Sequence, residues 1–160
     1  MGRMRVGFGY DVHRLEPGLK MVVGGVAIDH AKGWVAHSDG DVLIHAICDA
    51  LLGAASLRDI GVQFPDDSKE FEGIDSLKLL RRTVELIGEK GYHVGNVDAT
   101  IALQRPKLKP HIDEMRARMA DVMGVDVDDV SVKATTTEGL SFEGDGTGGS
   151  AYAVALIERD

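Results

Sequence analysis

Two spacings of hydrophobic residues recur along this chain, one typical of strands and one typical of helices. In residues 97–104 apolar residues alternate with mostly polar ones, which predicts a strand with one buried face that ends before Pro106 and Pro110. Shorter apolar runs between turn residues predict the remaining strands. Strands are expected at residues 4–9, 19–23, 26–28, 97–104, 130–134 and 151–157.

Apolar residues recur with helical spacing in three other segments. Ser38 or Asp39 is the expected N-cap of the first helix, and Gly91 and Gly124 are expected to end the other two. The helices are predicted at residues 41–55, 76–90 and 112–122.

The chain contains no linker, repeat or low-complexity segment that would divide it, and 160 residues suit one domain with a substantial core. We therefore expect a single domain over residues 1–160, of the α+β class, with helices packed on one face of a mixed sheet. Residues 57–72 lack both spacings. A loop of that length is often functional.

Composition narrows the function more than the fold. The net charge of −8 argues against broad binding of nucleic acids or anionic membranes, so a phosphate site would be built locally from backbone amides, metal ions and a few lysines. Cys48 is the only cysteine and lies in an apolar helical run, which indicates a buried thiol in a reducing compartment. The sequence has no apolar run of about eighteen residues and no apolar signal core. We expect a cytoplasmic protein.

Three residues near the N-terminus predict a zinc site. Asp11 and His13 are separated by one residue, so if residues 6–12 form a strand their side chains leave the same face of the sheet. His45 lies in the first predicted helix and would project toward that strand end. Three ligands of this kind leave one zinc position open, as in catalytic sites.

The spacing alone also allows a hydrogen-bonded His13 and a core-facing His45. Asp49 follows His45 by one helical turn, where it could orient the imidazole or stand as an exposed polar residue.

Two further segments carry groups that suit a nucleotide. Residues 135–138, Thr-Thr-Thr-Glu, follow a predicted strand and offer three hydroxyls and a carboxylate for a phosphate and a divalent cation. β-Branched residues at a strand end are also ordinary. Residues 104–110 form a compact basic loop that could clamp a nucleotide or serve as a solvated turn.

Taken together, the motifs resemble the 2-C-methyl-D-erythritol 2,4-cyclodiphosphate synthase family of the non-mevalonate isoprenoid (terpenoid) pathway. The likeness runs from about residue 4 to residue 158 in the family's order and spacing. AHSDGD together with VKATTTE is its most specific part. The motifs that carry it are GYDVH, AHSDGDVLIHAICDALLGAASLRDIG, FPD, KGYHVGNVDATI, RPKLKPHI and VKATTTEGLSF.

The resemblance implies a ferredoxin-like subunit, a homotrimer with active sites between subunits, and a phosphorus–oxygen lyase reaction. The substrate would be 4-diphosphocytidyl-2-C-methyl-D-erythritol 2-phosphate, whose 2-phosphate attacks its own β-phosphorus to give a cyclic diphosphate and CMP. Such a reaction needs positioning and charge neutralisation rather than a protein nucleophile. The acidic composition predicts no nucleic-acid partner and no membrane partner.

The resemblance also assigns roles to residues. Asp11, His13 and His45 would hold one Zn²⁺ per subunit, and Glu138 would help to hold Mg²⁺ or Mn²⁺ on the diphosphate. His37 and Thr136 would stabilise the transition state. The implied substrate contacts are Asp11, Val12, His13, His37, Ser38, Asp59, Ile60, Gly61, Phe64, Pro65, Asp66, Asp67, Ser68, Leu103, Gln104, Arg105, Pro106, Lys107, Leu108, Lys109, Thr135, Thr136, Thr137, Glu138 and Phe142.

One stretch departs from the family pattern. Where some members carry an arginine and a glutamate facing a cavity on the trimer axis, this chain has Asp145 and Thr147, in a glycine-rich stretch that we expect to be a flexible turn. Two other function classes use parts of the same pattern. A metal-dependent phosphohydrolase would activate water at the open zinc position, and a non-catalytic trimer would bind an isoprenoid diphosphate on its axis. Asp145 disfavours the second, because a carboxylate repels a diphosphate.

Overall fold

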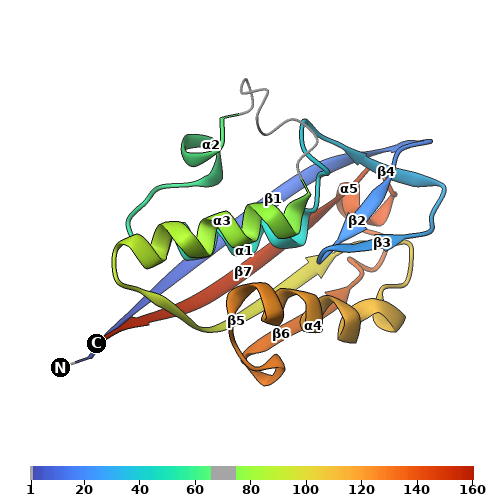
Figure 1. The fold of residues 1–160 in the computed structure, drawn as a ribbon. Coiled ribbons are helices and arrows are strands. Elements are labelled where there is room, and N and C mark those ends of the chain that lie inside the picture. Colours follow the sequence, from blue (N-terminus) through green and yellow to red (C-terminus); the bar gives the residue numbers. More distant parts are fainter. Residues whose placement is uncertain (1, 66–74) are drawn as a thin grey trace.

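The computed structural model describes residues 2–65 and 75–160, and its centre is one mixed five-stranded sheet (Figure 1). The strand order is β4-β1-β7-β5-β6; the parallel β5–β6 pair is joined to an otherwise antiparallel sheet. Two short strands form a separate sheet. The strands are β1 (Arg3–Pro17), β2 (Met21–Val23), β3 (Val26–Ile28), β4 (Lys32–Val35), β5 (His93–Ala102), β6 (Val130–Thr135) and β7 (Gly148–Arg159).

The main helices cover one face of this sheet (Figure 1). The α-helices are α1 (Val42–Ala54), α2 (Ile60–Gln63), α3 (Ser76–Glu89), α4 (Ile112–Met123) and α5 (Ser141–Gly144), with single 3₁₀ turns at Lys109–His111 and Val127–Asp129. The expected α+β architecture is therefore confirmed. The ferredoxin-like label is not confirmed, because the sheet strands β6 and β7 follow the β5–α4 crossover with only the four-residue helical turn α5 between them, whereas the ferredoxin-like unit runs β-α-β-β-α-β. None of the helices in the described ranges is long and apolar enough to cross a membrane.

Two glycines allow α1 to lie directly on β1. A Cβ at Gly7 would stand 1.9 Å from the Ala50 carbonyl oxygen, and one at Gly9 would stand 1.8 Å from that of Ala46. No side chain fits in that space, so glycine at these positions lets helix and strand backbones approach closely. Because Gly9 alternates with Asp11 on one strand face, the same approach brings the helix turn that carries His45 next to Asp11.

The first helix is capped by Asp41, not by Ser38 or Asp39. The Asp41 side chain is fully buried and accepts a hydrogen bond from the Ile44 amide at 3.1 Å. It also accepts from the amides of Gly24 and Gly25, at 3.0 and 2.8 Å, and from the Ser76 hydroxyl at 2.8 Å. One carboxylate thus joins the start of α1, the β2–β3 turn and the start of α3.

Several element boundaries also differ from those expected. The first strand extends to Pro17, because β7 pairs with it up to Arg14 and the unpredicted strand β4 pairs with residues 14–17. Strand β5 begins earlier, at His93, and accommodates a bulge near its start. Helical turns occur where we expected loops, at α2 and at α5.

The second face of the sheet is apolar and exposed. Side chains of β1 and β7 that alternate with the buried positions are 40–69% exposed, and the rings of Tyr10 and Tyr152 lie 5.1 Å apart on this face. An exposed apolar patch of this kind marks an interaction surface. Its residues are Met4, Val6, Phe8, Tyr10, Val12, Tyr152 and Val154.

Candidate active site

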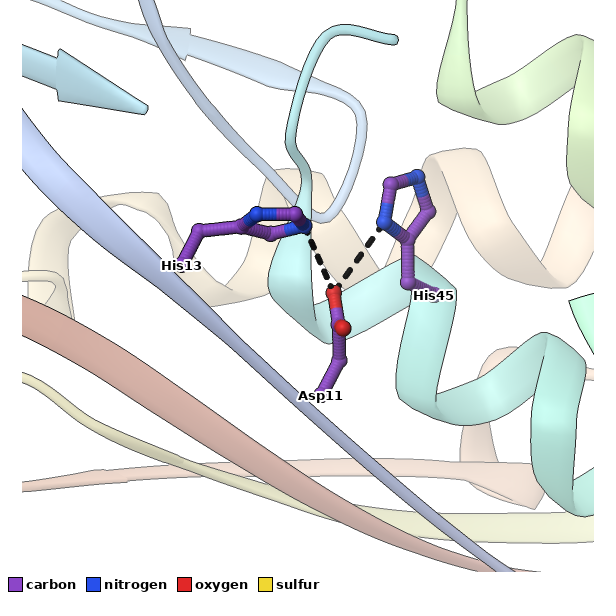
Figure 2. Close-up of side chains that lie close together, drawn as sticks. All are labelled: Asp11, His13 and His45. Carbon is purple, nitrogen blue, oxygen red and sulfur yellow. Dashed lines mark hydrogen bonds and ion pairs between the residues drawn. The ribbon is translucent and has the colours of Figure 1, made fainter. Parts of the chain in front are cut away.

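Asp11, His13 and His45 meet at the junction of β1 and α1. One carboxylate oxygen, Asp11 Oδ2, lies 3.1 Å from His13 Nε2 and 3.1 Å from His45 Nδ1 (Figure 2). The ligand atoms of all three residues lie within 4.8 Å of one another. Two imidazoles and one carboxylate at this spacing form a set that fits a divalent metal, as the sequence predicted.

Mutual contact within this triad changes the proton affinity of its members. Burial raises the pKa of Asp11, but hydrogen bonds with His13 and His45 outweigh it, so the carboxyl pKa is lowered. Burial lowers the pKa of His45, but the hydrogen bond and negative charge of Asp11 outweigh that effect, so its pKa is raised. In the metal-free protein the carboxylate therefore attracts a proton to the position where a cation would sit.

The triad opens into a cavity of about 250 Å³. Its far wall comes from α2 and the residue after it, and its rim comes from the segment that precedes α1. The lining residues are Asp11, His13, Ala36, His37, Ser38, His45, Ile60, Gly61, Phe64 and Leu79. Eight of these were proposed from sequence. Ala36 and Leu79 were missed.

The two ring nitrogens of His45 face Asp11 and Ser38. The Ser38 hydroxyl lies 3.3 Å from His45 Nε2. Asp49 neither orients this imidazole through a hydrogen bond of its own nor stands exposed, because its Oδ1 accepts a hydrogen bond from the Ile60 amide at 2.8 Å. Burial raises the pKa of Asp49 to about 6, against the opposing effect of that hydrogen bond.

The segments proposed for the nucleotide gather at the ends of the parallel strands β5 and β6. The Leu103 amide donates to the Thr135 carbonyl at 2.9 Å, and the Gly139 amide donates to the Gln104 side chain at 3.4 Å. The two segments therefore lie side by side at this end of the sheet, and we refer to residues 103–109 and 135–138 as the nucleotide surface, after the role that the family resemblance implies. Thr136 lies within it and accepts from the Glu138 amide at 3.3 Å, while Glu138 itself has a left-handed backbone, with φ of 55°.

This surface and the metal cavity are separate within one chain. The sheet pairing aligns Asp11 with Ala151, Ile101 and Ala134, so the triad and the end of β6 stand three strand spacings apart, about 14 Å. Above Gly149, the partner of His13 on β7, a Cβ would lie 2.6 Å from the Trp34 ring and 3.0 Å from Leu103. Trp34 and Leu103 thus fill the space between the two regions.

Other predicted contacts lie elsewhere. Val12 is on the opposite, exposed face of β1, and Phe142 is on α5 at the sheet end. Residues 66–68, Asp-Asp-Ser, lie outside the described residues, while Pro65 ends the first described range.

The glycine-rich stretch contains a helical turn, α5, rather than only the flexible turn expected there. Asp145 accepts hydrogen bonds from the amide and the hydroxyl of Thr147. Buried Glu143 accepts from the Ser150 hydroxyl at 2.8 Å, a contact the sequence did not signal. Asp145 and Thr147, the two residues that depart from the family pattern, are thus hydrogen-bonded to each other.

Comparison with known proteins identifies the family. A protein of Bacteroides fragilis named 2-C-methyl-D-erythritol 2,4-cyclodiphosphate synthase is 58% identical over 157 residues, covering 98% of this chain and 99% of its own. A solved synthase of the same name in a CDP-bound form has a TM-score of 0.88 and 36% identity, covering 96% of this chain and 99% of its own. The bifunctional IspDF of Campylobacter jejuni has a TM-score of 0.95 and 36% identity; the match covers this whole chain but only 43% of that longer protein. The YgbB family model matches residues 4–158, and the chain belongs to that family.

Proposed function

We propose that this protein converts 4-diphosphocytidyl-2-C-methyl-D-erythritol 2-phosphate to 2-C-methyl-D-erythritol 2,4-cyclodiphosphate and CMP, as a lyase of isoprenoid biosynthesis. The observation that carries the proposal is the Asp11–His13–His45 triad, which opens into a cavity in a chain that resembles named synthases along its whole length. The CDP named with one solved relative matches the nucleotide part of this substrate. We place the reaction in the cytoplasm, since the lone Cys48 is buried and unpaired.

The reaction joins two phosphates of one molecule. An oxygen of the 2-phosphate bonds to the β-phosphorus, the bond from that phosphorus to the oxygen bridging the α-phosphate breaks, and the electron pair leaves with CMP. No protein nucleophile and no water take part. The task of the protein is therefore to hold both phosphates in line and to balance their charge.

The triad suits zinc among the divalent metals. Two imidazoles and a carboxylate are its usual ligands, and three of them leave a position open for a phosphate oxygen. When bound there, zinc would supply Lewis-acid polarisation of the attacking phosphate. Asp11, His13 and His45 would hold and orient it, and the Ser38 hydroxyl beside His45 Nε2 would fix the imidazole.

The polar groups around the cavity divide the remaining work. His37 and Ser38 at the rim would bind phosphoryl oxygens, and Asp59 with α2 and Phe64 would bind the erythritol end. Residues 103–109 would hold the cytidine, and residues 135–138 would hold the diphosphate together with Mg²⁺ or Mn²⁺ on Glu138. His37 and Thr136 would donate to charge that develops in the transition state. Val12 and Phe142 would contribute at the edge of this site.

The two halves of the site would meet between neighbouring subunits of a homotrimer. Two observations support this. The apolar second face of the sheet is exposed in a single chain, and Trp34 with Leu103 separates the metal cavity from the nucleotide segments of the same chain. A cyclic trimer has three equivalent heterologous interfaces, each able to join the metal end of one chain to the nucleotide end of the next.

Phosphorus NMR of the purified protein with its substrate tests the reaction. A cyclic diphosphate together with CMP is the expected product pair. An open-chain phosphate would instead indicate a metal-dependent phosphohydrolase, and unchanged substrate would indicate a non-catalytic binder. Either of these results would overturn the proposal.

A further inference from the structure

Asp49 connects the helix that carries a metal ligand to the opposite wall of the cavity. It lies on α1 one turn after His45, and its Oδ1 accepts a hydrogen bond from the Ile60 amide at 2.8 Å. Ile60 is the first residue of α2. Ile60 and Gly61, with Phe64 just beyond this helix, line the cavity opposite the triad. A single carboxylate therefore links the two sides of the site.

Apolar packing also holds the α2 segment, because Ile60 packs partly buried against the core and Phe64, just after the helix, belongs to that core. None of the four residues of α2 is buried, and this helix is too short to hold itself together as an isolated helix. The Asp59 cap and the hydrogen bond from Gln63 to the Leu57 carbonyl at 2.9 Å lie within the segment. They shape it but do not tie it to α1.

The segment that connects α1 to α2 also contains two residues in an unfavourable backbone conformation. Ser56 and Arg58 have φ of 58° and 69°, in the left-handed region that costs free energy for residues with a side chain. Such conformations persist when surrounding contacts impose them. The Asp49 hydrogen bond is such a contact, because it joins a rigid thirteen-residue helix to the first residue after the connection.

We propose that Asp49 is a positioning residue that holds the Asp59–Phe64 segment in place opposite the metal triad. It acts through the backbone of Ile60 and does not touch the metal or the substrate. The part of this inference that concerns turnover rests on the proposed function. The part that concerns the position of α2 does not.

The charges around Asp49 favour a bond that strengthens as the carboxyl ionises. Asp59 on the α2 side and Asp11 on β1 raise its pKa, while His45 on α1 and the Ile60 amide lower it; with the dominant effect of burial the pKa is about 6. Above that pH the carboxylate accepts a charge-assisted hydrogen bond, which is stronger than a neutral one. The amide of Ile60 thereby becomes a reporter of Asp49.

Amide hydrogen exchange of the full-length protein without substrate tests the position of α2. In Asp49→Ala, amides of residues 60–64 should exchange at least about tenfold faster, while those of α1 stay protected. Asp49→Asn keeps an acceptor oxygen and should retain most of the protection. Asp126→Ala is the matched control, since it removes a carboxylate that accepts from the Asp128 amide far from the cavity. It should leave residues 60–64 unchanged.

Unchanged exchange at residues 60–64 in Asp49→Ala would overturn the proposal, as would an Asp49→Asn protein that exchanges as fast as Asp49→Ala. Turnover provides the second readout. With zinc content equal to that of the unsubstituted protein, kcat/KM of Asp49→Ala should fall about 10- to 100-fold, the scale of a misplaced binding group. Full activity in an Asp49→Ala protein with fast exchange would overturn the catalytic part. If the unsubstituted protein forms no cyclic product, the proposed function fails and the exchange result still decides the role of Asp49.

Discussion

The metal cavity and the nucleotide surface are built in different ways. In the cavity, three side chains from a long strand and a long helix contact one another, and His45 is almost fully buried. On the nucleotide surface, residues 135–138 are exposed or half-buried, and the hydroxyls of Thr135 and Thr136 bond within the loop. The first arrangement exists before any ligand arrives. The second offers backbone and hydroxyl groups that a ligand can still engage.

This difference predicts two kinds of metal binding: an ion held at the triad before the substrate binds, and an ion at Glu138 that arrives with the substrate. Ligands held by rigid elements keep their geometry without help, so an ion bound at the triad would stay there between turnovers. Glu138 follows the end of β6 and has a left-handed backbone, and among the described residues it belongs to no group of three or more potential metal ligands. A cation there would depend on the phosphates that it accompanies.

The largest effect is expected from His45→Ala. It removes one of three ligands from the preformed site, so zinc content should fall from about one per chain to a small fraction. Turnover should fall by at least about a thousandfold, since a metal at a phosphoryl group is worth several kcal/mol. Elemental analysis and phosphorus NMR measure the two losses.

His93→Ala is a suitable control for this substitution. His93 is the first residue of β5, is not part of the triad, and pairs with Glu158. The His93→Ala protein should keep both zinc and activity. Circular dichroism should show that His45→Ala still folds, since the main core lies outside the triad. Full zinc content in His45→Ala would remove His45 from the ligand set.

Glu138→Gln should have the next largest effect and should leave the first region untouched. The substitution keeps the shape of the side chain and removes its charge. Zinc content should stay normal, turnover should fall about 100-fold, and more Mg²⁺ or Mn²⁺ should be required. Metal titrations of the rate measure this. An unchanged requirement would show that Glu138 only shapes its loop.

The sequence predicted the metal region better than the contacts that support it. Residue alternation and helical spacing indicated that Asp11, His13 and His45 lie together, because all three lie in long regular elements, and the family resemblance favoured a metal site over the structural alternative that the spacing left open. The predicted N-cap of α1 was wrong. Asp41 takes this position with hydrogen bonds from Gly24, Gly25 and Ser76, which are distant in the sequence.

Three short elements were missed, strand β4 and the helical turns α2 and α5, and for β4 the reason is again a contact with a distant segment. Strand β4 has four residues, and its Gly33 lies where a Cβ would stand 2.1 Å from the Lys20 carbonyl oxygen. A close backbone approach of this kind leaves no hydrophobic spacing to detect. The hydrogen bond from the Ile60 amide to Asp49 could not be predicted from the sequence either. Its donor is a backbone amide, which every residue except proline has.

Mixed trimers test whether the two regions act across an interface. His13→Ala lacks a proposed zinc ligand, and Glu138→Gln lacks the carboxylate proposed to bind Mg²⁺ or Mn²⁺. Each protein alone should therefore be inactive or nearly so. After they are unfolded together and reassembled at equal amounts, random assembly gives intact sites at about one quarter of the wild-type number, half times half. Wild-type protein taken through the same procedure is the control. A mixture as inactive as its parents would place each site within one chain.

The smallest effect concerns pH, and it again separates the regions. In the metal-free protein Asp11 raises the pKa of His45 above its ordinary value of 6.5. The stability that this proton contributes is fully present below that ordinary value and is lost as pH rises through the raised pKa. Zinc requires the neutral imidazole, so its binding strengthens over the same range.

The zinc-induced rise in Tm should therefore increase as the pH rises from 6.5 through the raised pKa of His45. At a free zinc concentration of a hundred times Kd, binding contributes about 2.7 kcal/mol, and a protein of this size gains about 5–10 °C from it. Thermal unfolding of the metal-free protein with and without zinc measures the difference. Glu138→Gln should show the same pH dependence as the unsubstituted protein, because its side chain belongs to the other region, and His45→Ala should lose it. A Glu138→Gln protein with a diminished zinc effect would show that Glu138 and the triad hold the same ion, and the contrast between the two regions would fail.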